Sequence, residues 1–152
     1  MALKPHRVES YTDVSYFMDT AAERGGIVVH TTSGSGVAID DGNAVVAYPT
    51  GVNSGTKPAG LLLNDVVSID LTRQHINWYR DEVPVGSKVT VLRQGQVATN
   101  MVASGATPTA GADAYYDTVG KLTTVSTNSV KVGRFLGSKD ADGYVKVDIN
   151  IT

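Results

Sequence analysis

The chain has 152 residues, which fits one domain, and its 41% of hydrophobic residues are enough for a packed core. Its 13 basic and 15 acidic residues give a net charge of −2, so no general attraction to nucleic acid or to an anionic membrane is expected. It contains no cysteine, which excludes disulfides, thiolate nucleophiles and cysteine-based metal sites.

Residues 1–25 differ from the rest because they place aromatic side chains among polar and charged neighbours. They contain no apolar stretch typical of a signal peptide. As a helix, the segment would be capped by Asp13. As an extended segment, it would place Tyr16 and Met18 on one side. The helical pattern has slightly more matches, and with either structure we expect an N-terminal arm over 1–25 and a single β domain over 26–152.

Short β-branched segments follow the arm. Ile27–His30 and Ala44–Tyr48 are two of them, and the Asp-Asp-Gly-Asn sequence at 40–43 predicts a tight turn before the second. Residues 49–60 are rich in Gly, Pro, Ser and Thr, and such a long loop is expected to be mobile or to take part in an interaction. Residues 61–79 alternate apolar and polar side chains, which predicts another strand.

The second half predicts six strands separated by turns at intervals of about 8–12 residues. They are 88–92, 97–102, 114–116, 121–125, 130–136 and 144–151. Gly133 falls in the middle of its strand, which indicates a bulge or a closely approaching backbone. The pattern is typical of a compact antiparallel β-barrel or β-sandwich, like a β-tulip or jelly roll, with few or no helices.

The residue types that catalysis requires are sparse. The three histidines, His6, His30 and His75, are not accompanied by a serine elbow at a strand-to-helix turn. No two of them have metal-ligand spacing. The sequence Asp140–Gly143 begins like a calcium loop but lacks the later ligands, so a hairpin turn is favoured. We therefore expect no catalytic residue, no metal and no cofactor.

One aromatic pair remains to be explained. Trp78 and Tyr79, with Arg73 and Arg80 nearby, could form a stacking platform for bases or sugars. A core tryptophan with a surface tyrosine explains the same residues and is favoured. A small module that binds carbohydrate or nucleic acid therefore stays an alternative function.

Three segments resemble phage capsid decoration proteins, also called cement or head-stabilising proteins. Gly111–Thr124 combines a strand, an Asp-x-x-Gly turn and a second strand ending in Thr. Val132–Ile149 contains a Val-Gly strand that turns into a final alternating strand, and Asp81–Thr90 is similar to the central Pro-x-Gly step of those proteins. The resemblance covers residues 80–152.

The resemblance implies a non-catalytic virion protein, assembled in the host cytoplasm and placed on the outer capsid surface. Such proteins commonly form homotrimers that bridge major capsid proteins after head expansion, so we expect the major capsid protein as partner, and neither nucleic acid nor membrane. Another phage structural part, such as a tail, baseplate or head-fibre adaptor, is an alternative. The expected contact residues are Tyr11, Tyr16, Phe17, Met18, Trp78 and Tyr79.

The arm is expected to lie across a neighbouring subunit or to add a strand to its sheet. If so, deleting residues 1–25 would abolish attachment and leave the domain folded.

Overall fold

The computed structural model describes residues 3–4, 7–31, 45–50, 56–63, 82–83 and 85–151. In this part of the chain the fold is all β, and it contains no helix that is long and apolar enough to cross a membrane. The strands are β1 (Val8–Met18), β2 (Ala22–Glu23), β3 (Ile27–His30), β4 (Val45–Ala47), β5 (Pro58–Leu62), β6 (Glu82–Val83), β7 (Lys88–Thr99), β8 (Asp113–Tyr116), β9 (Leu122–Thr123), β10 (Lys131–Phe135) and β11 (Val145–Asn150).

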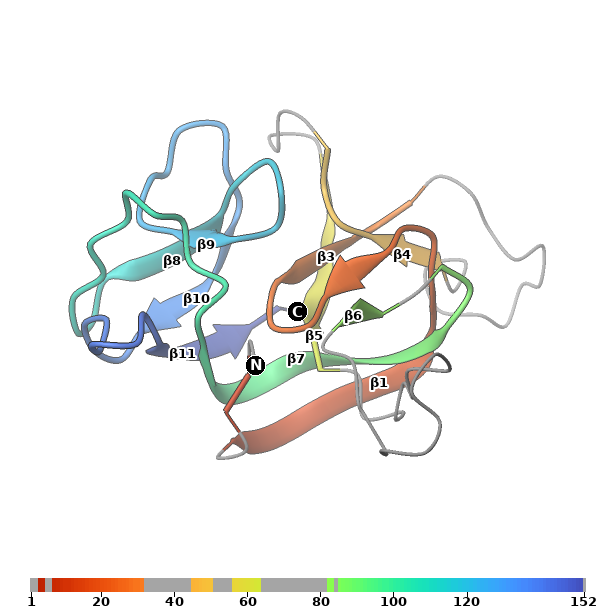
Figure 1. Ribbon diagram of the computed structural model, residues 1–152, viewed down its shortest axis with the longest axis horizontal. Coiled ribbons are helices and arrows are strands. Elements are labelled where there is room, and N and C mark those ends of the chain that lie inside the picture. Colours follow the sequence, from red (N-terminus) through yellow and green to blue (C-terminus); the bar gives the residue numbers. More distant parts are fainter. Residues whose placement is uncertain are drawn as a thin grey trace.

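Five strands close into a barrel in the order β1-β4-β3-β5-β7 (Figure 1). The barrel closes because β7 pairs with β5 along one edge and with β1 along the other. The expected β-barrel is confirmed. Its sheet is mixed, since β1 and β4 run parallel while the other neighbours are antiparallel.

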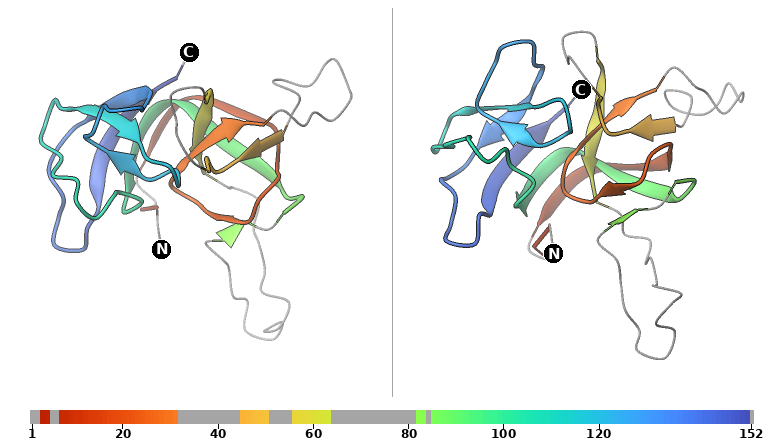
Figure 2. Two further views of the ribbon diagram at one scale, coloured as in Figure 1. Left: turned by 90° about the horizontal axis from the view of Figure 1, so that it is seen from above. Right: turned by 45° about the horizontal axis from the view of Figure 1, so that its top comes forward.

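The strand β7 also carries a second layer. It is 12 residues long, and the edge that pairs with β5 at 91–92 continues into pairing with β11 over 94–99. From β11 the sheet extends outward through β10, β8 and β9, and these strands lie beside the barrel (Figure 2). The turn expected at 93–96 is therefore wrong, because the chain runs through Gly95 as one strand.

The barrel strands β3 and β5 are buried on both faces, which explains their uninterrupted apolar sequences. In β3, Val28 packs inside the barrel, while Ile27 and Val29 pack toward the outer sheet. In and after β5, Leu62 points inward, and Leu61 and Leu63 point outward. Successive strand residues face opposite sides, so a run of three apolar residues serves two separate cores.

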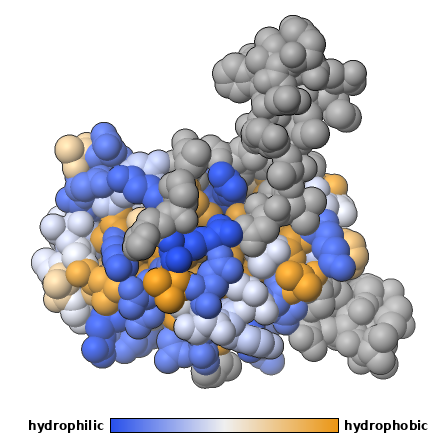
Figure 3. Space-filling view, turned by 90° about the horizontal axis from the view of Figure 1, so that it is seen from below, coloured by the Kyte–Doolittle hydropathy of each residue, from blue (hydrophilic) through white to orange (hydrophobic). Residues whose placement is uncertain are grey.

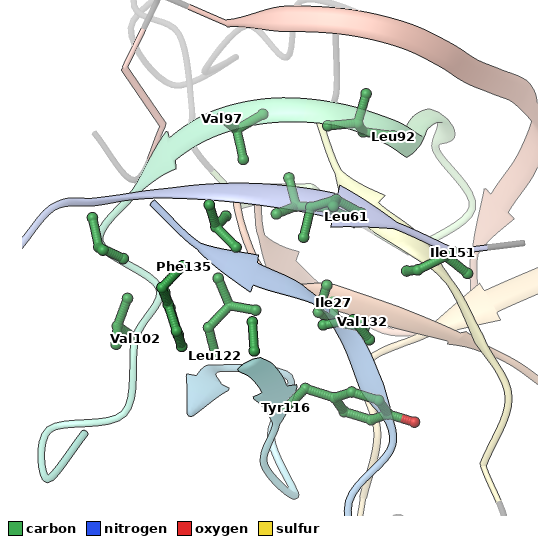
Figure 4. Close-up of a cluster of buried hydrophobic side chains, with 14 of the residues drawn as sticks. Ile27, Leu61, Leu92, Val97, Val102, Tyr116, Leu122, Val132, Phe135 and Ile151 are labelled. Atoms are coloured by element: carbon green, nitrogen blue, oxygen red, sulfur yellow. The ribbon is translucent and has the colours of Figure 1, made fainter. Parts of the chain in front are cut away.

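The larger core lies between the barrel and the outer sheet (Figure 4). The outer sheet contributes Tyr116, Leu122, Val132 and Phe135, which are fully buried. At about 25 cal/mol per Å² of apolar area removed from water, such large side chains are a main source of stability. The two layers are therefore held together as one folded unit.

Two sequence predictions in the outer sheet are confirmed. The register of β10 against β8 shifts between Lys131 and Gly133, and a methyl group on Gly133 would lie 2.0 Å from the backbone oxygen of Asp148 in β11. The hairpin before β11 is closed by Asp140, whose Oδ1 accepts hydrogen bonds from the backbone N–H groups of Asp142 and Tyr144 at 3.0 and 2.8 Å. This Asx-type turn fixes the reversal of the chain.

The N-terminal segment forms a strand, so the helical alternative is wrong. β1 pairs with β7 along most of its length, and Tyr16 and Met18 are buried inside the barrel. Upstream of β1, Leu3 is buried in the larger core, and the backbone N–H of Lys4 donates to the carbonyl of Ala98 at 3.0 Å. Deleting residues 1–25 would therefore remove core side chains along with any contact surface.

Candidate functional site

The structure divides the expected contact residues into two groups. Tyr11 and Phe17 are 47% and 42% exposed, so both can reach a partner. Tyr16 and Met18 are almost completely buried and serve the barrel core, so they are unavailable for contact in the folded protein. Trp78 and Tyr79 lie outside the described residues.

The two exposed aromatics belong to a longer apolar row along β1. We define the β1 row as Val8, Tyr11, Val14 and Phe17, each between 42% and 56% exposed. A regular strand would not expose every third residue, but the pairing of β1 with β7 has three register shifts that change the alternation. Val8 and Val14 could not be predicted as contact residues, because these irregularities have no simple signature in the sequence.

The turn that leads into β7 extends this row. Val85 is 64% exposed. Its neighbour Gly86 donates its N–H to the carbonyl of Met18 at 2.8 Å, and Met18 donates its N–H to the carbonyl of Ser87 at 3.0 Å. These bonds hold Val85 close to the Phe17 end of β1. Figure 3 views the molecule from below and shows hydrophobic surface interspersed with hydrophilic surface on that side.

The β1 row is held on a rigid support. The guanidinium carbon of Arg93 in β7 lies 5.5 Å from the centre of the Tyr11 ring, a cation–π arrangement. Arg7 and Glu9 form an ion pair beside Val8. Because β1 is also hydrogen-bonded to β7, a partner would find these side chains already positioned, which lowers the entropic cost of binding.

Two partly buried titratable groups in the barrel pack against or hydrogen-bond to their neighbours. The ring of His30 packs edge-on against Tyr16 with 5.6 Å between ring centres. The hydroxyl of Tyr48 donates to the backbone carbonyl of Glu23, and burial raises the pKa of Tyr48 well above its ordinary value. A neutral, hydrogen-bonded tyrosine in this position stabilises the fold.

A second tyrosine connects the two layers. The hydroxyls of Tyr116 in β8 and Thr56 before β5 are hydrogen-bonded, and burial raises the pKa of Tyr116. The described residues include no group of three or more His, Asp or Glu side chains arranged to hold a metal ion.

Comparison with known families extends the resemblance over the first half of the chain. The family described as "Structural cement protein (E217 gp24/Pam3 gp6)", from phages, matches residues 4–150. The match includes β1 and the barrel as well as the outer sheet. No curated protein matches the chain significantly.

Proposed function

Since the chain belongs to the phage structural cement protein family, we propose that it binds the outer surface of the expanded head and stabilises contacts between major capsid subunits. The family implies association with the capsid and a place in the virion, and it implies a structural, non-catalytic role. Binding to the major capsid protein, the outer surface and the expanded state are the specific parts of the proposal.

The observation that carries the proposal is the β1 row. Tyr11 and Phe17 are aromatic, and aromatic side chains are enriched among the residues that dominate the energy of protein interfaces. Val8 and Val14 add apolar area between them. Because the row lies on a strand fixed to β7, it can be covered by a capsid subunit without reordering the chain.

We further propose that the protein acts as a homotrimer on the capsid. The support is the resemblance to decoration proteins together with a general physical advantage. Three linked copies that engage three sites at once gain avidity, so each β1 row needs to bind only weakly. A cement that binds in this way strengthens a shell whose subunits are pushed apart from within.

A pair of matched variants tests the role of the β1 row. Val14→Asp places a charge in the middle of the row, and Val119→Asp places the same charge at a similarly exposed valine in the turn between β8 and β9. Co-sedimentation with expanded heads that lack the protein measures binding. We expect Val14→Asp to weaken binding at least about tenfold, because a carboxylate would be buried without a partner.

Val119→Asp is expected to bind like the wild type. Thermal unfolding of both variants serves as the folding control, since both positions are solvent-exposed in the free protein. Equal binding by Val14→Asp and the wild type would contradict the assignment of the β1 row as the capsid contact.

A further inference from the structure

A groove of about 480 Å³ opens where one end of the barrel meets the outer sheet. Its walls come from β3 and the start of β5 on the barrel side, from the middle of β7, and from β10 and the end of β11 on the other side. We define the basic groove by six of its lining residues. They are His30, Thr56, Lys57, Arg93, Lys131 and Asn150.

Backbone contacts bring these distant residues together. The N–H of His30 donates to the carbonyl of Lys57 at 3.0 Å, so the end of β3 lies beside the start of β5. The N–H of Ile151 donates to the carbonyl of Arg93 at 2.8 Å, which places the end of β11 against β7. The groove is thus built on paired strands, which hold side chains more precisely than a free loop does.

The alternation of the barrel strands explains why two of these side chains reach the groove. Val28 and Val91 lie inside the barrel, and His30 and Arg93 follow two residues later on the same faces of β3 and β7. Tyr16 packs under His30 and is itself buried. The basic groove therefore lies where the polar end of the barrel meets the outer sheet.

Positive charge predominates in the groove. Three of its lining residues are Lys or Arg, and none of the described lining residues carries a carboxylate. The ammonium of Lys131 lies 2.8 Å from a carboxylate oxygen of Asp113, so its charge is compensated from outside the groove. Lys57 and Arg93 supply the remaining cationic groups.

The hydrogen-bonding capacity of the Arg93 side chain is incompletely satisfied. Its Nε atom is buried and has no hydrogen-bond partner within the described part of the chain. A buried donor without a partner destabilises the folded state. A ligand oxygen in the groove would remove this cost, and the planar guanidinium is suited to a carboxylate or a similar oxyanion.

We infer that the basic groove binds an acidic polypeptide segment of a neighbouring subunit. The carboxylates of that segment would form ion pairs with the side chains of Arg93 and Lys57. The volume far exceeds the needs of a single carboxylate, and the Thr56 hydroxyl and Asn150 amide can hydrogen-bond to a peptide backbone. This second contact goes beyond the β1 row, and the two surfaces meet at Arg93, whose guanidinium also lies 5.5 Å from the centre of the Tyr11 ring.

Isothermal titration calorimetry of the full chain with a hexaglutamate peptide blocked at both ends tests the inference. We expect binding that weakens with added salt, and no binding of hexaglutamine or inorganic phosphate at the same concentrations. Lys57→Gln and Arg93→Gln should each weaken hexaglutamate binding by about tenfold, the loss expected for one charge-assisted hydrogen bond.

Lys88→Gln is the matched control, because Lys88 is an exposed cation at the start of β7 and does not line the groove. Lys57 is exposed, so its substitution leaves the fold intact even if Arg93→Gln is destabilising. Failure of hexaglutamate to bind, equal binding of phosphate, or equal weakening by Lys88→Gln would each overturn the inference. Because no phage heads are used, failure here leaves the proposed β1 contact standing.

Discussion

Gly95 in β7 lies directly against Val8 in β1, and a methyl group on Gly95 would stand 2.2 Å from the backbone oxygen of Val8. The backbone of Gly95 has a φ of +150°, which side-chain-bearing residues rarely adopt. Glycine is therefore required at this point of β7, which is paired with both β1 and β11.

Gly95→Ala is expected to lower the free energy of unfolding by at least about 2 kcal/mol, because both the backbone strain and the clash must be relieved. Urea denaturation measures the effect. Gly105→Ala is the control, since a methyl group there meets open space, and it should stay within about 1 kcal/mol of the wild type. Similar stabilities for the two variants would contradict the close approach of Gly95 to the backbone of Val8.

Substitutions of two adjacent residues on β1 are expected to have different effects, one on the stability of the fold and the other on binding to heads. Met18 is buried in the barrel core, so Met18→Ala should cost about 2–5 kcal/mol of stability. Phe17 is exposed, so Phe17→Ala should cost less than about 1 kcal/mol and weaken attachment to heads instead. Denaturation and co-sedimentation on the same two preparations provide the comparison, and a large stability loss in Phe17→Ala would contradict it.

The hairpin before β11 is expected to make stability depend on pH in acid. The backbone N–H of Tyr144 is the main cause that lowers the pKa of Asp140 below its ordinary value of 3.8, with further help from Lys4 and the N–H of Asp142. A carboxyl whose pKa is lower in the folded state stabilises the fold above pH 3.8, and this contribution is lost as the pH falls through the folded-state pKa.

Asp140→Asn should therefore show a smaller drop in melting temperature between pH 7 and pH 3 than the wild type. Asp142→Asn removes a charge from the same turn but keeps the Asp140 carboxylate, so it should retain the wild-type drop. A wild-type pH profile in Asp140→Asn would show that the Asp140 carboxylate adds nothing to folding.

The sequence predicts the β class and the outer sheet well because their signals are local. Gly133 and the turn at Asp140 follow from residue chemistry at one position, and β11 alternates without interruption. The run 27–29 indicates a strand, although only the structure shows that it serves two cores. The strand β5 (Pro58–Leu62) begins inside the loop expected at 49–60.

The barrel and the contact surface are harder to predict because they depend on irregular pairing. Register shifts in β1 break the period of two, so the sequence does not tell which of Tyr16 and Phe17 faces outward. Gly95 resembles a turn residue but lies inside a strand. The basic groove joins residues from 30 to 150, and no local pattern connects side chains so far apart in the chain.

The central proposal, that this member of the cement family covers the expanded head, is tested most directly by counting bound copies. Purified protein is added to expanded heads that lack it, and the bound copies per major capsid subunit are measured at saturation, followed by imaging of the decorated heads. The account predicts saturation near one copy per capsid subunit, with trimers at threefold positions. Saturation at a few copies per particle, or no binding at all, would contradict it.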